Sequence, residues 1–428
     1  MADIFYLIET ISLCIMILIA VLLTISYKIK LNMYFITYYL FCIFFILPEL
    51  QIRVFGFPNG IYKGFLLIKD NLLVDVIWFI VTLIQYCIIL YMAIKKGKRI
   101  NYTIDLKNIK IPQGIRIIAW ILLFVPTASA IFSPQPSLYF AAFGPFYRRD
   151  VYNVTEAAVD YHYAIMSKCL NLSILGIIIL WLYSQNKKQP ILRFFVCAVA
   201  LEILLFSNKR TLGSLIILMM LIIDIYFNKK NNLMKIISVC GFLIIYFIFY
   251  HVYVKYQDNS SMLNFSYSYQ LYFGRVLDMK LIIYSLLNPD VLKILEYPGQ
   301  SLLFDVLFFV PRTLWKNKPY PFAMYYSAAV HMWSIDNVNG RFLTSFFAEI
   351  ICNLSWAGVL IGPWIYYKII NFVEKIDNKF MYFFAVYTCI YLFITQIGSN
   401  LYNLLILVLL YFLKKCKFKK IKIKIKLH

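Results

Sequence analysis

The chain has 428 residues, of which 62% are hydrophobic and 14% are charged, and its mean hydropathy is +0.75. This composition is far more apolar than that of a water-soluble protein of the same length. A net charge of +22 would suggest nucleic-acid binding in a soluble chain. Here the basic residues gather between apolar runs, where they report membrane topology instead. The sequence therefore predicts an all-α, polytopic integral membrane protein.

Apolar runs of roughly 17 to 25 residues recur along the chain, which is the length that an α-helix needs to cross a hydrocarbon core about 30 Å thick. We predict about eleven transmembrane helices, within a range of roughly ten to twelve. They are placed at 4–26, 31–50, 72–94, 115–133, 163–184, 190–207, 211–227, 235–253, 341–367, 380–397 and 400–413. The first run lacks a preceding basic stretch and a cleavage site of small residues, so it is expected to be a span rather than a cleaved signal peptide.

Basic residues cluster in loops that share one side of the predicted membrane. The clusters are "KKGKRI", "QNKKQ", "NKKNNLMK" and "KKCKFKKIKIKIKLH". Because Lys and Arg accumulate in cytoplasmic loops, this pattern places the N-terminus outside and the C-terminus in the cytoplasm. The polybasic tail 414–428 alternates Lys and Ile, and it is expected to rest on anionic lipid rather than to form an amphipathic strand.

Motifs for metal or nucleotide chemistry are missing from the sequence. The nine cysteines lie almost entirely in apolar runs and form no C-x-x-C pair, and the four histidines are scattered. There is no H-E-x-x-H and no G-x-x-x-x-G-K-[ST]. We therefore expect no metal site and no cofactor, and neither an ATP-driven pump nor a zinc protease.

The long segment 254–340 is predicted to lie outside the membrane on the extracytoplasmic side. It is too long to be a simple connector, and loops of this kind often carry function. Within it, "LIIYSLL" (281–287) and "SLLFDVLFFVP" (301–311) are too short to span, so they predict helices in the membrane interface or a re-entrant pair over a cavity. With no internal repeat or linker, residues 1–428 are expected to form a single membrane domain.

Arg210 stands in a short turn at the outer end of the sixth and seventh runs. A guanidinium stays charged and offers a fixed fork of donors, which suits phosphate or carboxylate binding. The alternative is a side chain that snorkels to the membrane surface. More basic residues occur on the same side than the positive-inside rule predicts: Arg275, Arg312, Lys316, Lys318 and Arg341. Together they indicate an anionic partner at the membrane surface, either a lipid-linked pyrophosphate, another anionic lipid or a polyanion.

Glu349 lies about two turns inside a predicted span, in "RFLTSFFAEIICNLSWAGVLIG". An ionised carboxylate there is costly unless it is paired, so it is a candidate functional residue. The alternative is a structural ion pair with one of the arginines. His331 lies eighteen residues before Glu349 and could reach the outer mouth of the same span.

The chain resembles the Wzy-type oligosaccharide repeat-unit polymerases of bacterial O-antigen and capsule pathways. The resemblance rests on many spans, a short S-x-K-R turn, a long outer loop, "FFVPRTLWKNKP" and "TSFFAEIICNLSWAGVLIG", and it is best over 200–370. The matched positions are Ser207, Lys209, Arg210, Arg275, Pro311, Arg312, Trp315, Lys318, Pro319, Ser345, Glu349, Asn353 and Gly358. The first 160 residues match by hydropathy alone.

The resemblance implies a glycosyltransferase at the outer face of the bacterial cytoplasmic membrane. It would move the growing chain from undecaprenyl pyrophosphate to the non-reducing-end hydroxyl of the next lipid-linked unit, without a cofactor. Because the leaving group departs as an anion, cationic stabilisation matters more than an acid, while the acceptor hydroxyl needs a base. Catalytic roles fall on Arg210, Arg275, Glu349 and His331. Substrate-binding roles fall on Lys209, Arg312, Trp315, Lys318 and Arg341.

The implied partners are lipid-linked oligosaccharide, membrane lipid, a chain-length regulator and a flippase, and no nucleic acid. Three other functions stay open. An O-antigen ligase shares the topology and the large outer loop. A flippase of lipid-linked oligosaccharide would carry basic residues along several helices, whereas here they lie at the outer ends. A non-catalytic scaffold would tolerate changes at Arg210 and Glu349.

Overall fold

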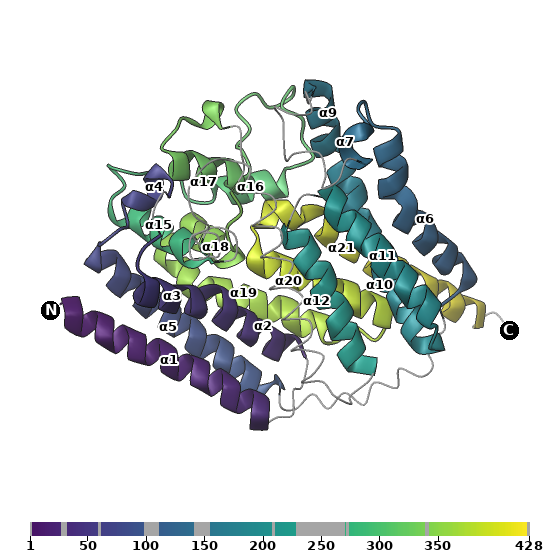
Figure 1. Ribbon diagram of the computed structural model, residues 1–428, viewed down its shortest axis with the longest axis horizontal. Coiled ribbons are helices and arrows are strands. Elements are labelled where there is room, and N and C mark those ends of the chain that lie inside the picture. Colours follow the sequence, from purple (N-terminus) through teal and green to yellow (C-terminus); the bar gives the residue numbers. More distant parts are fainter. Residues whose placement is uncertain are drawn as a thin grey trace. The chain divides into compact units, whose positions relative to one another are not determined.

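A computed structural model describes residues 2–26, 32–58, 61–97, 111–140, 155–207, 210–227, 270, 274–338 and 342–425. Of 25–26, 140, 159, 163, 203–207, 210–214, 411 and 413–425 it describes the backbone only. Within these ranges the regular secondary structure is entirely helical (Figure 1). The predicted all-α class is confirmed.

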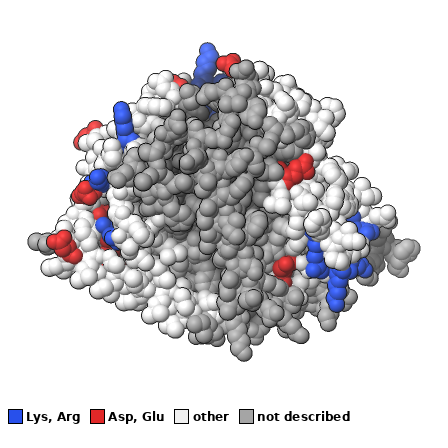
Figure 2. All heavy atoms as spheres, in the orientation of Figure 1, with Lys and Arg blue, Asp and Glu red and all other residues white. Residues whose placement is uncertain are grey.

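Six described segments are long and apolar enough to cross a membrane. They are Ala2–Thr24, Met33–Phe55, Leu72–Lys95, Gln113–Ile131, Ala164–Lys187 and Phe346–Val373. Each coincides with a predicted run, and large apolar side chains such as Ile4 and Leu7 are 65% and 62% exposed, as lipid-facing residues are. On the face shown in Figure 2, most of the described surface carries no charge. The chain is an α-helical membrane protein.

The predicted count of about eleven spans is not confirmed. Three predicted runs coincide with shorter apolar helices, at Leu215–Phe227, Lys379–Ile394 and Ile397–Leu410. A fourth coincides with α11 (Pro190–Ser207), whose side chains are described in part, and the run at 235–253 lies outside the described residues. Helix α21 (Ile397–Ile425) continues through most of the basic tail, so the tail's alternating Lys and Ile form no strand as far as Ile425.

The contacts divide the chain into two compact units. Unit 1 comprises Met1–Asn101, Asn264–Ile376 and Thr388–His428, and unit 2 comprises Tyr102–Leu263 and Asp377–Tyr387. In unit 2, α10 (Ser167–Lys187) packs against α6 (Gln113–Ile131), α11 and α12 (Arg210–Phe227). Unit 2 also includes the short helices α7 (Ser137–Phe140) and α9 (Glu156–Tyr161) and a π turn at His162–Met166.

Close packing in unit 2 depends on a small residue at one helix crossing. A Cβ added at Gly176 of α10 would lie 2.6 Å from the carbonyl oxygen of Ala119 in α6. Glycine therefore lets the two backbones approach, as small residues do between membrane helices. Nearby, Glu202 of α11 accepts a hydrogen bond from the Thr127 hydroxyl at 3.0 Å.

Unit 1 begins with three membrane spans. These are α1 (Ala2–Ser26), the continuous helix α2 (Met33–Phe41), η1 (Cys42–Ile46) and α3 (Leu47–Phe55), and α5 (Leu72–Lys95), with the one-turn α4 (Lys63–Leu66) before α5. Helix α1 contacts α3, η1 and α5, beside which it runs in Figure 1. Asn32 and Asn71 cap the second and third spans, since each side-chain oxygen accepts a backbone N–H of the first turn.

The second span contains a π turn because of a proline. Pro48 has no N–H, so the carbonyl of Phe44, four residues earlier, loses its helical donor. The helix widens over η1, and the Phe44 carbonyl instead accepts the backbone N–H of Arg275 at 2.9 Å. The Pro48 carbonyl accepts from the Gln270 side chain. These bonds hold the start of α15 (Val276–Leu287) against the second span.

The rest of unit 1 follows these contacts along the chain. Its helices are α15 (Val276–Leu287), α16 (Gln300–Val306), α17 (Phe322–His331), η5 (Ile335–Asn337), α18 (Phe346–Leu354), η6 (Ser355–Ala357), α19 (Gly358–Val373), the end of α20 (Lys379–Ile394) and α21. The segment predicted at 281–287 belongs to α15, which packs against α5 and α18 and is buried along its first two turns. The segment predicted at 301–311 is helical only over α16.

Candidate active site

Glu349 lies in the first turn of α18, after Ser345, whose hydroxyl accepts the Ala348 N–H at 3.1 Å and caps the helix. The side chain of Glu349 is completely buried. Its Oε2 accepts the backbone N–H of Ile397 at 2.7 Å, and its Oε1 accepts the Ser301 hydroxyl at 3.1 Å. Among the described residues it forms no ion pair, so the alternative of an arginine partner finds no support there.

The donor at Ile397 is the first N–H of α21. Such N–H groups have no partner within their own helix, and the helix dipole adds partial positive charge at this end. Gln396 fixes the geometry, because its side-chain oxygen accepts the Thr344 N–H at 3.1 Å just before α18. The helix terminus therefore stabilises an ionised Glu349 in place of a basic side chain.

Asp305 of α16 faces the Glu349 carboxyl and is 6% exposed. Neither of its oxygens has a donor in the described part of the chain. A Cβ at Gly398 would lie 3.0 Å from Asp305 Oδ1, so the glycine at the start of α21 leaves room for this carboxyl. Burial first, and then the neighbouring Glu349 carboxylate, raise the pKa of Asp305 to about 9. Two ionised carboxyls in contact would repel each other, so the contact favours a shared proton, with Asp305 as the donor and Glu349 as the acceptor.

Asn353, one turn after Glu349, positions α16. Its backbone carbonyl accepts the Gly299 N–H at 3.0 Å, and its side chain bonds the Ser301 N–H at 3.3 Å and the Ser301 hydroxyl at 2.8 Å. Gly299 has a φ of +80°, which favours glycine at this turn. These bonds aim the Ser301 hydroxyl at Glu349, and Asp305 stands one helical turn further along the same face.

Arg275 is 2% exposed, and its donors are used inside the protein. Its Nε donates to the Ile394 carbonyl at 2.9 Å and its Nη1 to the Gly274 carbonyl at 3.0 Å, with Asp278 3.7 Å away. Asp278 also accepts the Tyr326 hydroxyl at 2.7 Å, and burial raises its pKa to about 6 against the effect of Arg275. A catalytic role for Arg275 stays a prediction, and its contacts are those of a residue that joins α15, α17 and α20.

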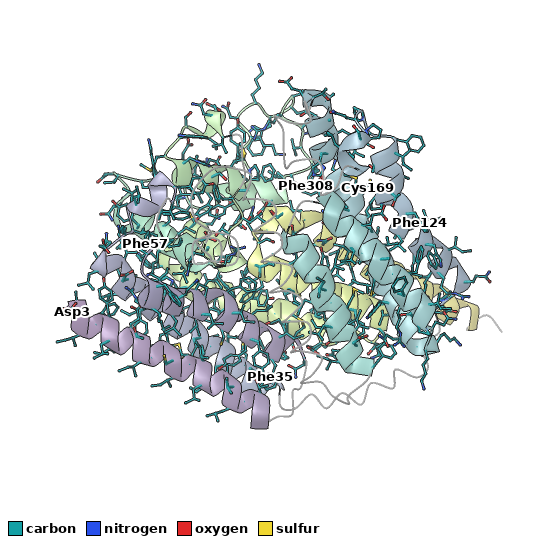
Figure 3. All side chains as sticks on the ribbon, viewed as in Figure 1. Asp3, Phe35, Phe57, Phe124, Cys169 and Phe308 are labelled. Carbon is teal, nitrogen blue, oxygen red and sulfur yellow. The ribbon has the colours of Figure 1, made fainter. Side chains whose placement is uncertain are left out.

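The predicted substrate-binding residues after α16 form hydrogen bonds within their own loop. Lys318 Nζ donates to the carbonyls of Phe308 and Val310, each at 2.8 Å, and Phe308 is labelled in Figure 3. The Arg312 guanidinium donates to the Lys318 carbonyl at 2.7 Å and to the Pro319 carbonyl at 3.0 Å. Lys318 is buried, whereas Arg312 is exposed and its guanidinium also lies 4.0 Å from the centre of the Tyr320 ring. Trp315, in the same loop, is half-buried.

His331 belongs to a separate aromatic cluster at the C-terminal end of α17. Its ring stacks on Trp333 at 4.3 Å and meets Tyr62 edge-on at 4.8 Å. Burial lowers the pKa of His331, so its imidazole is neutral at neutral pH. The opposite end of α17 lies near the carboxyl pair, since Pro321 and Asp305 both approach Gly398. The structure therefore brings Asp305, not His331, to Glu349.

Three predicted residues cannot be placed at the site. Lys209 and Arg341 lie outside the described residues, and Arg210 begins α12 with only its backbone described. Their predicted roles stay predictions. Asp305 and Ser301 are the residues that sequence reasoning did not assign, although their spacing of four residues in an apolar segment places both on one helical face.

Within the described residues, no group of three or more His, Cys, Asp or Glu side chains is arranged to hold a metal ion. No family model, curated protein or solved structure matches the chain. The candidate site is therefore defined by its geometry: two buried carboxyls, a hydroxyl and a helix N-terminus at one end of a membrane span.

Proposed function

We propose that the protein polymerises undecaprenyl-pyrophosphate-linked oligosaccharide units at the outer face of the bacterial cytoplasmic membrane. The observation that carries the proposal is the Asp305–Glu349 pair, two buried carboxyls in contact, of which Glu349 lies in the first turn of a span. Sugar transfer to a hydroxyl needs a group that removes the hydroxyl proton during attack. A lipid-linked substrate brings its reacting bond to this depth, at the end of the spans.

The proton transfer follows from the different hydrogen-bond partners of the two carboxyls. Both Glu349 oxygens already accept hydrogen bonds, whereas neither Asp305 oxygen has a described donor, so we assign the contact with the acceptor hydroxyl to Asp305. As the hydroxyl oxygen forms its bond to the anomeric carbon, its proton passes to the free oxygen of Asp305, and Asp305 passes its own proton to Glu349. The bond from the anomeric carbon to the pyrophosphate oxygen breaks, and the electron pair leaves with the pyrophosphate. The surplus proton returns to water after product release.

The leaving pyrophosphate requires positive charge rather than an acid, because it departs as a stable anion. We assign this role to Arg210, with Lys209, Arg312 and Arg341 as further candidates on the same predicted side of the membrane. Arg312 is an exposed residue in the loop that directly follows α16. Arg275 and Lys318 are assigned to positioning, since both are buried and their described donors bond to the protein's own carbonyls.

The function is tested in a strain that lacks this gene and carries either wild type or Arg210→Ala at equal membrane abundance. Surface polysaccharide is resolved on gels, and lipid-linked intermediates are identified by mass spectrometry. We expect single repeat units on the outer-leaflet carrier, or capped onto the acceptor, in the deletion strain and in Arg210→Ala. Full-length polymer that stays on its carrier would identify a ligase instead, and units trapped in the inner leaflet would identify a flippase.

A further inference from the structure

A second buried group of charges lies in unit 1, away from the carboxyl pair. It joins three spans and α15 through five ionisable side chains, Glu9, Glu49, Arg53, Asp75 and Lys280. We call it the ion cluster. Glu9 and Glu49 are completely buried, Lys280 is 2% exposed and Asp75 is 5% exposed. Sequence reasoning did not assign it.

Both cations are shared by Glu49 and Asp75. Lys280 Nζ lies 2.8 Å from Glu49 Oε2 and 2.7 Å from Asp75 Oδ1. Arg53 Nη2 lies 2.7 Å from Glu49 Oε1 and 3.1 Å from Asp75 Oδ2, which also accepts the Tyr6 hydroxyl at 3.2 Å. These two carboxylates are thus neutralised by the two cations.

Glu9 is the carboxyl left over. Its Oε2 lies 2.8 Å from Arg53 Nε, but its Oε1 is buried without a hydrogen-bond partner in the described residues. The cluster also contains an unused donor, because Trp78 is completely buried, its ring lies 5.0 Å from Lys280 Nζ, and its Nε1 has no described partner. A hydrogen-bond acceptor on Glu9 and a donor on Trp78 are therefore buried between the helices without described partners.

Three carboxylates outnumber two cations in this cluster, which leaves one uncompensated negative charge at membrane depth. Such a charge is expensive in a low-dielectric interior, and the cost falls if one acid binds a proton. We propose that Glu9 is a proton-binding site and that its proton holds the outer part of α1 in place. Removal of the proton leaves a third carboxylate beside Glu49 and Asp75, and the like charges repel each other.

The position of α1 makes it sensitive to this change. Helix α1 packs mainly against α3, η1 and α5, and most of its surface faces outward. Glu9 lies within about two turns of the labelled Asp3, near the helix start (Figure 3). Repulsion at Glu9 would therefore loosen the first turns of α1 and leave the rest of the unit packed.

Several other titratable groups on the packed elements have partners of their own. Cys42 of η1 interacts with Tyr38. Tyr86 of α5 donates to the Met16 carbonyl at 3.2 Å, and Lys95 bonds Tyr91 at the far end of α5. Tyr6, Glu49, Arg53, Asp75 and Lys280 are the groups that surround Glu9, and only Glu9 among the acids lacks a second cation contact.

The test uses the full chain in lipid nanodiscs, with Glu9→Gln, Glu9→Asp and the exposed-site control Glu156→Gln. Infrared difference spectra report the C=O band of protonated carboxyls, and hydrogen exchange, corrected for intrinsic rates, reports protection in the first turns of α1. We expect Glu9→Gln to remove one carboxylic-acid band that Glu156→Gln keeps. As the pH rises, protection in α1 should fall at least several-fold in wild type and Glu9→Asp, and stay constant in Glu9→Gln.

Two results would overturn the proposal. One is an unchanged carboxylic-acid band in Glu9→Gln, together with wild-type pH dependence of α1 protection. The other is loss of α1 protection when sodium is replaced by choline at constant pH, because the charge would then be balanced by a bound cation. If Glu9→Gln does not fold, the pH titration of the band and of α1 protection in wild type and Glu9→Asp decides the matter, since both should titrate together.

Discussion

At neutral pH the side chain of Asp305 is a hydrogen-bond donor, because two ionised carboxyls in contact would repel each other and leave both Asp305 oxygens unsatisfied. Glu349 is the natural acceptor, since the Ile397 N–H and the Ser301 hydroxyl already stabilise its charge. The pair thus separates into an acid and a base by environment alone. This division is what a proton-accepting site for a sugar hydroxyl requires.

Replacing Asp305 by Asn should change how stability depends on pH. The folded pKa of about 9 lies above the unfolded value of about 4, so the folded chain binds more protons between them. Wild type should therefore lose stability relative to Asp305→Asn as the pH rises from about 4 to about 9. Thermal unfolding of the detergent-solubilised proteins across this range measures the difference. The exposed control Asp290→Asn should show the same pH dependence of stability as wild type. If the stability difference between wild type and Asp305→Asn does not change with pH, Asp305 is not protonated in the folded chain.

One half of this site can be predicted from the sequence. Glu349 is visible in the sequence because a carboxyl inside an apolar run is costly and rare. Asp305 is not visible in this way, because its partner is 44 positions away and only the fold brings α16 to α18. The roles of Arg275 and Lys318 escape sequence reasoning for a related reason, since a basic residue can bind a ligand or the protein's own carbonyls, and composition does not distinguish the two.

At the scale of elements, the boundaries of membrane-spanning helices can be predicted from the length and hydropathy of the apolar runs. The predicted span at 72–94 is observed at Leu72–Lys95, and that at 115–133 at Gln113–Ile131. Interruptions inside spans follow from the tertiary structure instead. The π turn before Pro48 persists because Arg275 supplies the missing donor from another helix, and α18 and α19 are separated by a turn at Ser355–Ala357.

Gly358 is expected to control how closely α18 and α19 pack. A Cβ there would lie 2.6 Å from the Ile350 carbonyl oxygen and 2.7 Å from the Ile351 Cα, both rigid backbone atoms. Gly358→Ala should therefore cost about 1–3 kcal/mol of stability. The matched control is Gly114→Ala, where no atom lies within 4 Å of the new Cβ. It should be neutral or stabilise α6 by up to about 1 kcal/mol. Equal melting temperatures for the two variants would contradict this packing.

At the scale of the whole molecule, the predicted membrane topology can be tested by labelling. The eleven predicted spans and the basic clusters after alternate runs together predict that the two termini lie on opposite sides of the membrane. In a cysteine-free background, Asp336→Cys should react with an impermeant thiol reagent from outside intact spheroplasts. Lys188→Cys should react only after the membrane is opened. The reverse labelling pattern would invert the proposed orientation and place the carboxyl pair on the cytoplasmic side.

The proposed function rests on the chemistry of the carboxyl pair, so the most direct measurement is polymer formation by its isosteric variants. In the deletion strain, Asp305→Asn, Glu349→Gln and the control Asp290→Asn are expressed at equal membrane abundance, and chain length is resolved on gels. We predict that Asp290→Asn restores long chains and that Asp305→Asn and Glu349→Gln reduce polymerisation by about 10²- to 10⁴-fold, the usual contribution of a general base. Single repeat units should then accumulate on the outer-leaflet carrier. Wild-type chain lengths in both carboxyl variants would contradict the account.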